Sequence, residues 1–245
     1  MATIRTKSGF ESWRDGIDNA VGNTKWNSYD CEIQLAVNEF NRHLSGTDGY
    51  SPLDWQFVKA MTWVESGAGN PKWKNSPIQI GNRGDLGLGA LLSGKEGGDL
   101  ILPPHWQPRL TFASAQMIPS HNIRAGIGYL LMKMANFDIK SISDADAKIY
   151  DVTVKAGDSL DKIAKAQGST LELMKKLNPT AHVLRPGQVL KYQKAVQKKV
   201  IVGWKPITTS SIASYYNGGG DSMYKTKLDY ALAAIRKSKG VVCSH

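Results

Sequence analysis

The chain has 245 residues, of which 41% are hydrophobic, and it carries a formal net charge of +10. The apolar content is ordinary for a globular protein, and no apolar run approaches the roughly 20 residues that a membrane span needs. The positive charge favours a polyanionic partner, which could be nucleic acid or the anionic polymers of a bacterial envelope.

In chain order, the first helical pattern covers residues 31–44, and a better-defined one begins near Ser51. Residues 51–54 read Ser-Pro-Leu-Asp, which offers a capping serine, a proline at the first helical position and an acid three residues after the cap. Apolar residues then recur at helical spacing until Gly67 and Gly69 end the pattern. Glu65 is therefore expected at the C-terminal end of an amphipathic helix.

The rest of the chain alternates between turn-rich and periodic segments. Residues 67–111 are rich in Gly, Pro, Asn and Asp, which indicates turns and irregular structure. Residues 121–137 have helical spacing, and residues 150–192 read strand–helix–helix–strand. A last helical stretch, about 210–236, is interrupted by Asn-Gly-Gly-Gly at 217–220.

The 150–192 segment resembles a LysM domain, a module that binds glycans containing N-acetylglucosamine. The likeness rests on Tyr-Asp-Val-Thr-Val at 150–154, Gly-Asp-Ser-Leu at 157–160, Leu-Asn-Pro at 177–179 and Leu-Arg-Pro-Gly-Gln at 184–188. The resemblance implies a sugar groove between the two loops of the module. The implied groove residues are Gly157, Asp158, Ser159, Leu160, Asn178, Pro179 and Leu184. Gly157 and Asp158 also suit a turn that caps the next helix.

Four other pieces resemble the lysozyme-like domain of goose-type lysozymes and soluble lytic transglycosylases. They are Glu-Ser at 65–66, Ser-Pro-Ile-Gln-Ile at 76–80, the Asn-Ile…Gly…Tyr-Leu pattern of 122–130, and Tyr-Asn-Gly-Gly at 216–219. The LysM-like segment lies between the third and fourth pieces. We therefore expect a mainly α fold, in which a lysozyme-like domain of residues 1–140 plus 203–245 is interrupted by a small α+β LysM domain at 148–194.

The resemblance implies that Glu65 is the general acid for cleavage of a glycosidic bond. Burial against apolar neighbours and the negative end of the helix dipole both favour a protonated carboxyl. Asp85 is the best candidate for a second carboxylate that activates water, but it equally suits a turn beside two glycines. In lytic transglycosylases a single glutamate serves first as acid and then as base.

The same resemblance assigns substrate binding to Ser76, Gln79, Tyr216 and Asn217. Two of these have structural alternatives, since Gln79 could be a buried amide and Tyr216 a core aromatic. The expected reaction is cleavage of the β-1,4 bond between N-acetylmuramic acid and N-acetylglucosamine in peptidoglycan, by hydrolysis or by transglycosylation. No Cys/His cluster has zinc spacing, so we expect no metal and no cofactor.

The expected partner is the glycan strand of peptidoglycan. We expect a monomer that binds no nucleic acid and has no membrane span. The first ten residues lack an apolar core, so we expect no cleavable secretory signal. The protein would reach the cell wall as a phage endolysin released by a holin, or as an injected antibacterial effector with an immunity protein. A non-catalytic wall-binding component of a phage tail or secretion apparatus is the alternative. Cys31 and Cys243 could pair in an oxidising compartment or remain free.

Overall fold

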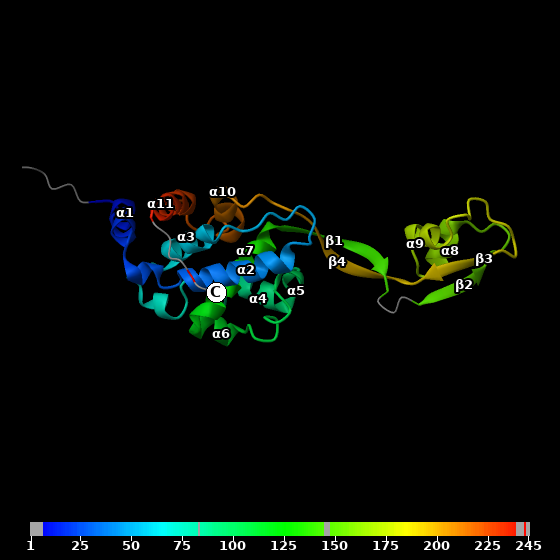
Figure 1. Cartoon of the computed structure of the whole chain (residues 1–245), viewed down its shortest axis with the longest axis horizontal. Coiled ribbons are helices and arrows are strands. Elements are labelled where there is room, and N and C mark those ends of the chain that lie inside the picture. Colours follow the sequence, from blue (N-terminus) through cyan, green and yellow to red (C-terminus); the bar gives the residue numbers. More distant parts are fainter. Residues whose placement is uncertain (1–6, 83, 145–147, 239–242, 244–245) are drawn as a thin grey trace, which may run out of the picture. The chain divides into compact units, whose positions relative to one another are not determined.

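The structure is a computed structural model that describes residues 7–82, 84–144, 148–238 and 243. The chain divides into two compact units (Figure 1), one discontinuous, made of Met1–Phe137 with Ile201–His245, and one formed by Asp138–Val200. The chain is 51% helix and 13% strand, so the expectation of a mainly α fold with a small β-containing insertion is confirmed.

The discontinuous unit is built from helices. In chain order they are α1 (Gly9–Ala20), η1 (Thr24–Asn27), α2 (Asp30–Leu44), α3 (Trp55–Glu65), η2 (Pro71–Lys74), α4 (Leu86–Ser93), α5 (Gly98–Ile101), α6 (Phe112–Met117), α7 (Pro119–Met134), α10 (Thr209–Ser211), the π-helical turn η3 (Ile212–Tyr216) and α11 (Tyr224–Lys237). The short elements η2, α4 and α5 lie in the segment that was expected to be irregular.

Helix α7 is the central element of this unit, because most of its residues are buried. It packs against α2, α4, α5, α6 and η3. The buried Arg124 of α7 pairs with Glu39 of α2, with Nε–Oε2 at 2.7 Å, and its guanidinium lies 4.2 Å from the ring centroid of Trp106. This charge is therefore compensated inside the interface between α2 and α7.

Helix α3 begins three residues later than the sequence pattern predicts. Its N-cap is Asp54, whose side chain accepts a hydrogen bond from the Gln56 amide at 2.9 Å. The prediction that Ser51 caps this helix is therefore wrong, because the acid placed in the first turn is itself the cap. The prediction that the helix ends at Glu65 is confirmed.

The Asp138–Val200 unit contains the strands β2 (Ile149–Thr153) and β3 (Val189–Gln193), with the helices α8 (Leu160–Ala166) and α9 (Leu171–Leu177) between them. The strands pair antiparallel, with Tyr150 opposite Tyr192. This unit has its own small core, made of Val154, Ile163, Ala164, Met174, Ala181, Leu190 and Tyr192. The predicted strand–helix–helix–strand order is confirmed.

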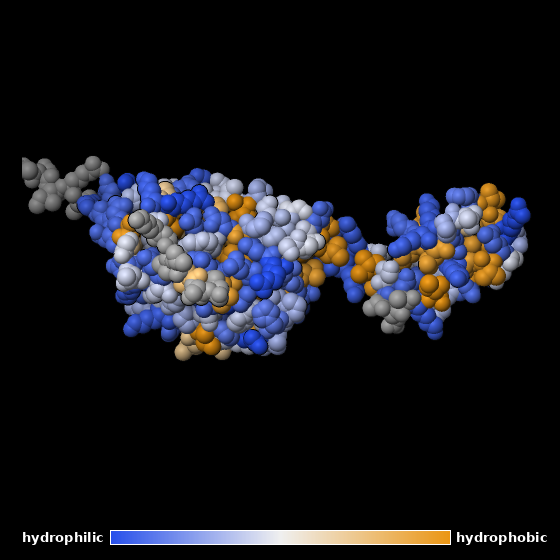
Figure 2. All heavy atoms as spheres, in the orientation of Figure 1, coloured by the Kyte–Doolittle hydropathy of each residue, from blue (hydrophilic) through white to orange (hydrophobic). Residues whose placement is uncertain are grey.

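Both passages between the units are strands. The outgoing strand is β1 (Ala135–Ser143), the returning strand is β4 (Ala195–Trp204), and the two pair as a separate two-stranded sheet. Figure 2 shows apolar side chains on the surface of the Asp138–Val200 unit, where the large exposed ones are Ile139, Ile142, Ile149, Val183 and Val189. Among the described residues, we find no helix with the length and apolar character required to cross a membrane.

The two cysteines form a disulfide bond. Cys31 lies in α2 and Cys243 lies near the end of the chain, 212 positions later, with their Cα atoms 5.5 Å apart. Of the two alternatives left open by the sequence, the structure has the paired one.

Candidate functional site

Glu65 is held where α3 turns into a loop. The amide of Gly67 donates to the Thr62 carbonyl at 3.0 Å, which closes the helix end. Gly67 has φ +64°, and a Cβ atom there would lie 2.6 Å from a ring carbon of Trp26. Only glycine suits both the left-handed backbone and this close approach. The tight turn fixes the direction in which the last residue of α3 projects.

A cavity of about 220 Å³ opens beside Glu65. Its lining comes from the end of α3, the loop before α4, α7 and η3, and consists of Glu65, Ile78, Gln79, Ile80, Asp85, Tyr129, Tyr216 and Asn217. The structure thus brings together Gln79, Asp85, Tyr216 and Asn217 around the proposed general acid, although the sequence separates Glu65 from Asn217 by more than half the chain.

The loop that carries Gln79 is braced by a buried asparagine of α7. Asn122 is fully buried, accepts from the Ile78 amide at 2.8 Å, and donates to the carbonyls of Ile80 and Ala115 at 2.9 and 2.8 Å. Gln79 has φ +57°, a left-handed conformation that costs energy for a residue with a Cβ. The fixed, buried neighbours Ile78 and Ile80 hold it in that conformation.

The closest partner of Glu65 is a tyrosine that the sequence did not reveal. The hydroxyl of Tyr224, the first residue of α11, donates to Glu65 Oε1 at 2.7 Å. Burial raises the pKa of Glu65 above its usual value, whereas the Tyr224 hydrogen bond acts in the opposite direction. Burial and the nearby Glu65 also raise the pKa of Tyr224. Its hydroxyl therefore stays protonated and remains a hydrogen-bond donor to the carboxyl.

Two charged residues near the start of α11 shift the pKa of the same carboxyl: Asp221 lies just before the helix and Lys227 lies within it. The negative charge of Asp221 raises the pKa of Glu65, and the positive charge of Lys227 lowers it. Asp221 and Lys227 form an ion pair with Oδ2 and Nζ 2.7 Å apart. Asn217 Oδ1 accepts from the Asp221 amide at 2.9 Å, so this predicted substrate-binding side chain also fixes the loop.

Asp85 lines the cavity but its carboxylate is occupied by backbone donors. Oδ1 accepts from the amides of Gly87 and Leu88 at 2.8 and 3.1 Å, and Oδ2 accepts from the Gly81 amide at 2.7 Å. Asp85 is therefore the N-cap of α4. This geometry favours the turn-forming alternative over activation of water.

Tyr216 lies at the η3 side of the cavity, with its ring edge-on to Tyr129 at a centroid distance of 5.4 Å. Burial and the negative charge of Glu65 raise the pKa of Tyr216, so the hydroxyl stays protonated. The side chain of the neighbouring Tyr215 is 48% exposed and does not line the cavity.

Ser76 is the one predicted residue of this set that does not line the cavity. Its carbonyl accepts a hydrogen bond from the Gln79 amide at 3.0 Å, so Ser76 helps to fix the turn that carries Gln79. Lys72 contacts one of the lining residues, with its Nζ 3.2 Å from Gln79 Oε1. Neither Lys72 nor Tyr224 belongs to a motif that the sequence singled out.

The Asp138–Val200 unit has a separate cavity of about 410 Å³. It is lined by Asp158, Ser159, Leu160, Asp161, Leu171, Lys175, Ala181, His182 and Leu184. Four of the seven predicted groove residues are in this lining, and three are not. Asn178 instead bonds to both backbone groups of Lys191, with Oδ1 accepting at 2.9 Å and Nδ2 donating at 2.7 Å. Gly157 and Pro179 also lie outside the lining.

Comparison with known proteins identifies only this smaller unit. Residues 152–192 match the family model of the LysM domain. The LysM match indicates binding to peptidoglycan glycan strands. No curated protein and no solved structure was found to match the chain.

Proposed function

We propose that the protein is a peptidoglycan-cleaving enzyme, with Glu65 as general acid and the LysM segment as its wall-binding module. The observation that carries this proposal is the partly buried Glu65 carboxyl with a raised pKa, beside a cavity that is also lined by Gln79, Tyr216 and Asn217. A carboxylic acid with a raised pKa can protonate the leaving oxygen of a glycosidic bond near neutral pH.

The proposed reaction uses one carboxyl group. Glu65 gives its proton to the bridging oxygen, the bond to the anomeric carbon breaks, and the resulting carboxylate then accepts a proton from the attacking group. Asp85 is committed to capping α4, which supports this single-carboxyl scheme over a pair of carboxylates. The Tyr224 hydroxyl donates to Glu65 Oε1 at 2.7 Å and so orients the carboxyl.

The attacking group determines the class of enzyme. Attack by water gives a reducing end and defines a muramidase, whereas attack by the 6-hydroxyl of the same sugar gives a 1,6-anhydro end and defines a lytic transglycosylase. We favour the transglycosylase, because Asp85 is not free to activate water. We further propose that the protein reaches the wall as an endolysin or as an effector paired with an immunity protein.

Mass spectrometry of the material released from purified peptidoglycan tests the proposal. We expect soluble muropeptides with 1,6-anhydro ends from the wild type. Reducing ends would keep the enzyme but overturn the transglycosylase scheme. Release of no muropeptides, together with retention of the protein on the wall, would support a non-catalytic wall-binding component, a role for which the LysM match alone suffices.

A further inference from the structure

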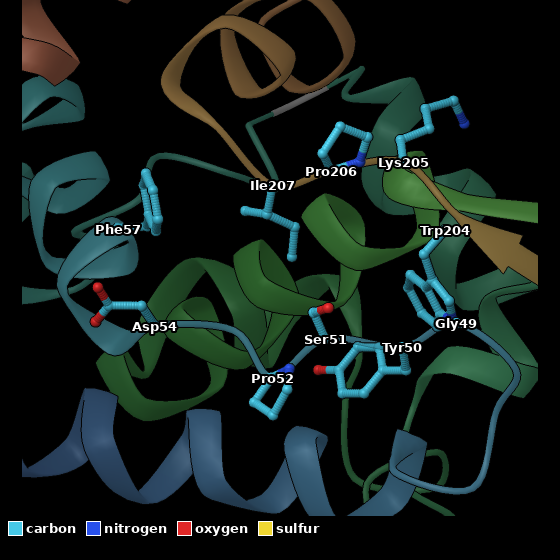
Figure 3. A pocket seen from close by; sticks show the side chains of 10 residues that line it. All are labelled: Gly49, Tyr50, Ser51, Pro52, Asp54, Phe57, Trp204, Lys205, Pro206 and Ile207. Atoms are coloured by element: carbon cyan, nitrogen blue, oxygen red, sulfur yellow. The ribbon is translucent and has the colours of Figure 1, made fainter.

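A second cavity lies at the opposite end of α3 from Glu65. It measures about 340 Å³ and is lined by Gly49, Tyr50, Ser51, Pro52, Asp54, Phe57, Trp204, Lys205, Pro206 and Ile207 (Figure 3). Asp54 caps the start of α3, and Glu65 is its last residue. Eleven residues of helix rise roughly 16 Å, so the two cavities are separate.

The lining of this cavity includes three half-buried aromatic residues: Tyr50, Phe57 and Trp204. The rings of Tyr50 and Trp204 meet edge to face, with centroids 4.8 Å apart. Their polar atoms are already bound within the protein, since the Tyr50 hydroxyl donates to Asn41 Oδ1 at 2.7 Å and Trp204 Nε1 donates to Thr47 Oγ1 at 3.0 Å. The rings are therefore fixed, and what they offer a ligand is carbon surface.

The charged side chains that line this cavity already have partners within the protein. Asp54 Oδ2 pairs with Arg236 Nη2 at 3.0 Å, and the Lys205 ammonium donates to the Lys133 carbonyl at 3.0 Å. A strongly charged ligand would have to break one of these contacts. A neutral ligand with an apolar face could instead use the spare lone pairs of the Asp54 carboxylate and the Ser51 hydroxyl, both of which line the cavity.

We propose that this cavity is a second glycan site, which binds a neutral N-acetylated hexosamine unit. Such a ring has a face of C–H groups that packs on fixed aromatic carbons and a rim of hydroxyls and amide that bonds to Asp54 and Ser51. The LysM match favours a sugar over other neutral ligands, because it indicates that this chain binds glycan strands. Two sites on one chain would strengthen retention by avidity. This proposal is independent of whether Glu65 cleaves the strand.

The test must distinguish this cavity from the LysM groove in the full-length protein. The chain has seven tryptophans, and a Trp204→Phe variant identifies the indole N–H signal of Trp204 in a ¹H–¹⁵N spectrum. The probe is a tetramer of N-acetylglucosamine added to the Glu65→Gln form, so that the probe is not consumed. We expect a saturable shift of the Trp204 signal, and about tenfold weaker binding at this signal in Phe57→Leu.

Two comparisons make the result specific. Asp54→Asn keeps a capping oxygen for α3 but loses the charge, so it should weaken the Trp204 response while the helix stays intact. Leu184→Ala in the LysM cavity should leave that response unchanged. An unmoved Trp204 signal while LysM signals shift would overturn the proposal. So would an equal shift with unacetylated glucose oligomers.

Discussion

The pKa of the proposed acid, Glu65, depends on partial burial and on one hydrogen bond. Glu65 receives its hydrogen bond from Tyr224, which lies 159 positions away in sequence. Its pKa is raised by burial and is partly restored by that bond. Tyr224 is therefore expected to control both the orientation and the protonation of the proposed acid.

A Tyr224→Phe substitution tests this expectation. The bond favours the ionised carboxyl, so its loss should raise the pKa of Glu65 further. The alkaline limb of the pH–rate profile should then move to higher pH, with a rate loss of about tenfold from poorer positioning. Tyr230→Phe is the matched control, because Tyr230 lies on the same helix and donates to Asp18 instead. An alkaline limb that moves equally in both variants, or in neither, would contradict the assigned role.

The raised pKa of Glu65 also predicts how stability depends on pH. A carboxyl with a raised pKa binds its proton more tightly in the folded state, so wild-type stability should fall as pH rises from the usual value of 4.5 through the raised pKa. Glu65→Gln does not titrate. The free energy of unfolding of Glu65→Gln, measured in urea relative to that of the wild type, should therefore increase with pH across that window. A difference that does not change with pH would show that burial does not perturb this carboxyl.

Sequence motifs predicted Gln79, Tyr216 and Asn217 near Glu65, and Asp85 was the candidate for a second carboxylate. All four line the cavity. Tyr224 could not be predicted in the same way, since a tyrosine at the start of a helix has no local signal for a distant partner. The turn-forming alternative for Asp85 was visible in its glycine neighbours, and its three backbone contacts favour it.

At the scale of elements, the cavity depends on how α7 holds the loop before α4. Asn122 connects α7 to both Ile78 and Ile80, on either side of Gln79. Gly126 lets the loop approach, since a Cβ atom there would lie 2.6 Å from Ile78. The central helix therefore contributes to the position of the loop, in addition to the hydrogen bonds within the loop.

An Asn122→Ala substitution should therefore be costly. It removes three hydrogen bonds and leaves buried backbone groups without partners, so we expect a loss of about 3 kcal/mol in the free energy of unfolding. Asn38→Ala, at an exposed position on α2, should change it by less than about 0.5 kcal/mol. Equal effects of the two substitutions in urea unfolding would show that Asn122 is not a brace.

Periodicity located the long elements well and the short ones poorly. Helices α2, α3 and α7 and the elements of the LysM segment have enough regular apolar positions to be read directly. Helix α1 was missed because its N-terminal region is mostly polar, although Ser8 and Glu11 form a capping box. The short helices between residues 67 and 111 depend on tertiary packing and glycine turns more than on propensity.

At the scale of the whole molecule, the disulfide links α2 to the end of the chain. It closes a loop with a sequence separation of 212, for which chain entropy predicts a stabilisation of about 5 kcal/mol at most. The double variant Cys31→Ser, Cys243→Ser should therefore unfold at lower urea concentration than the oxidised wild type. Reduced wild type is the control and should match the double variant. Unchanged unfolding on reduction would show that the bond does not restrain the chain.

The order of the units along the chain was predictable only through resemblance. Periodicity shows a strand–helix–helix–strand segment but not that the flanking parts fold together. The division into a discontinuous helical unit and Asp138–Val200 follows from contacts between parts of the chain that are distant in sequence, such as α3 with α11. Local sequence carries little information on such pairings.

The role of Glu65 is tested by the clearing of purified cell walls by wild type, Glu65→Gln and Asp85→Asn at equal wall-bound protein. We predict that wild type clears the suspension, that Glu65→Gln is slower by about 10²–10⁴-fold, and that Asp85→Asn stays within about tenfold of wild type, since asparagine also caps helices. Clearing by Glu65→Gln at the wild-type rate would show that Glu65 is not the general acid, and no clearing by folded, wall-bound wild type would show that the protein does not cleave the wall.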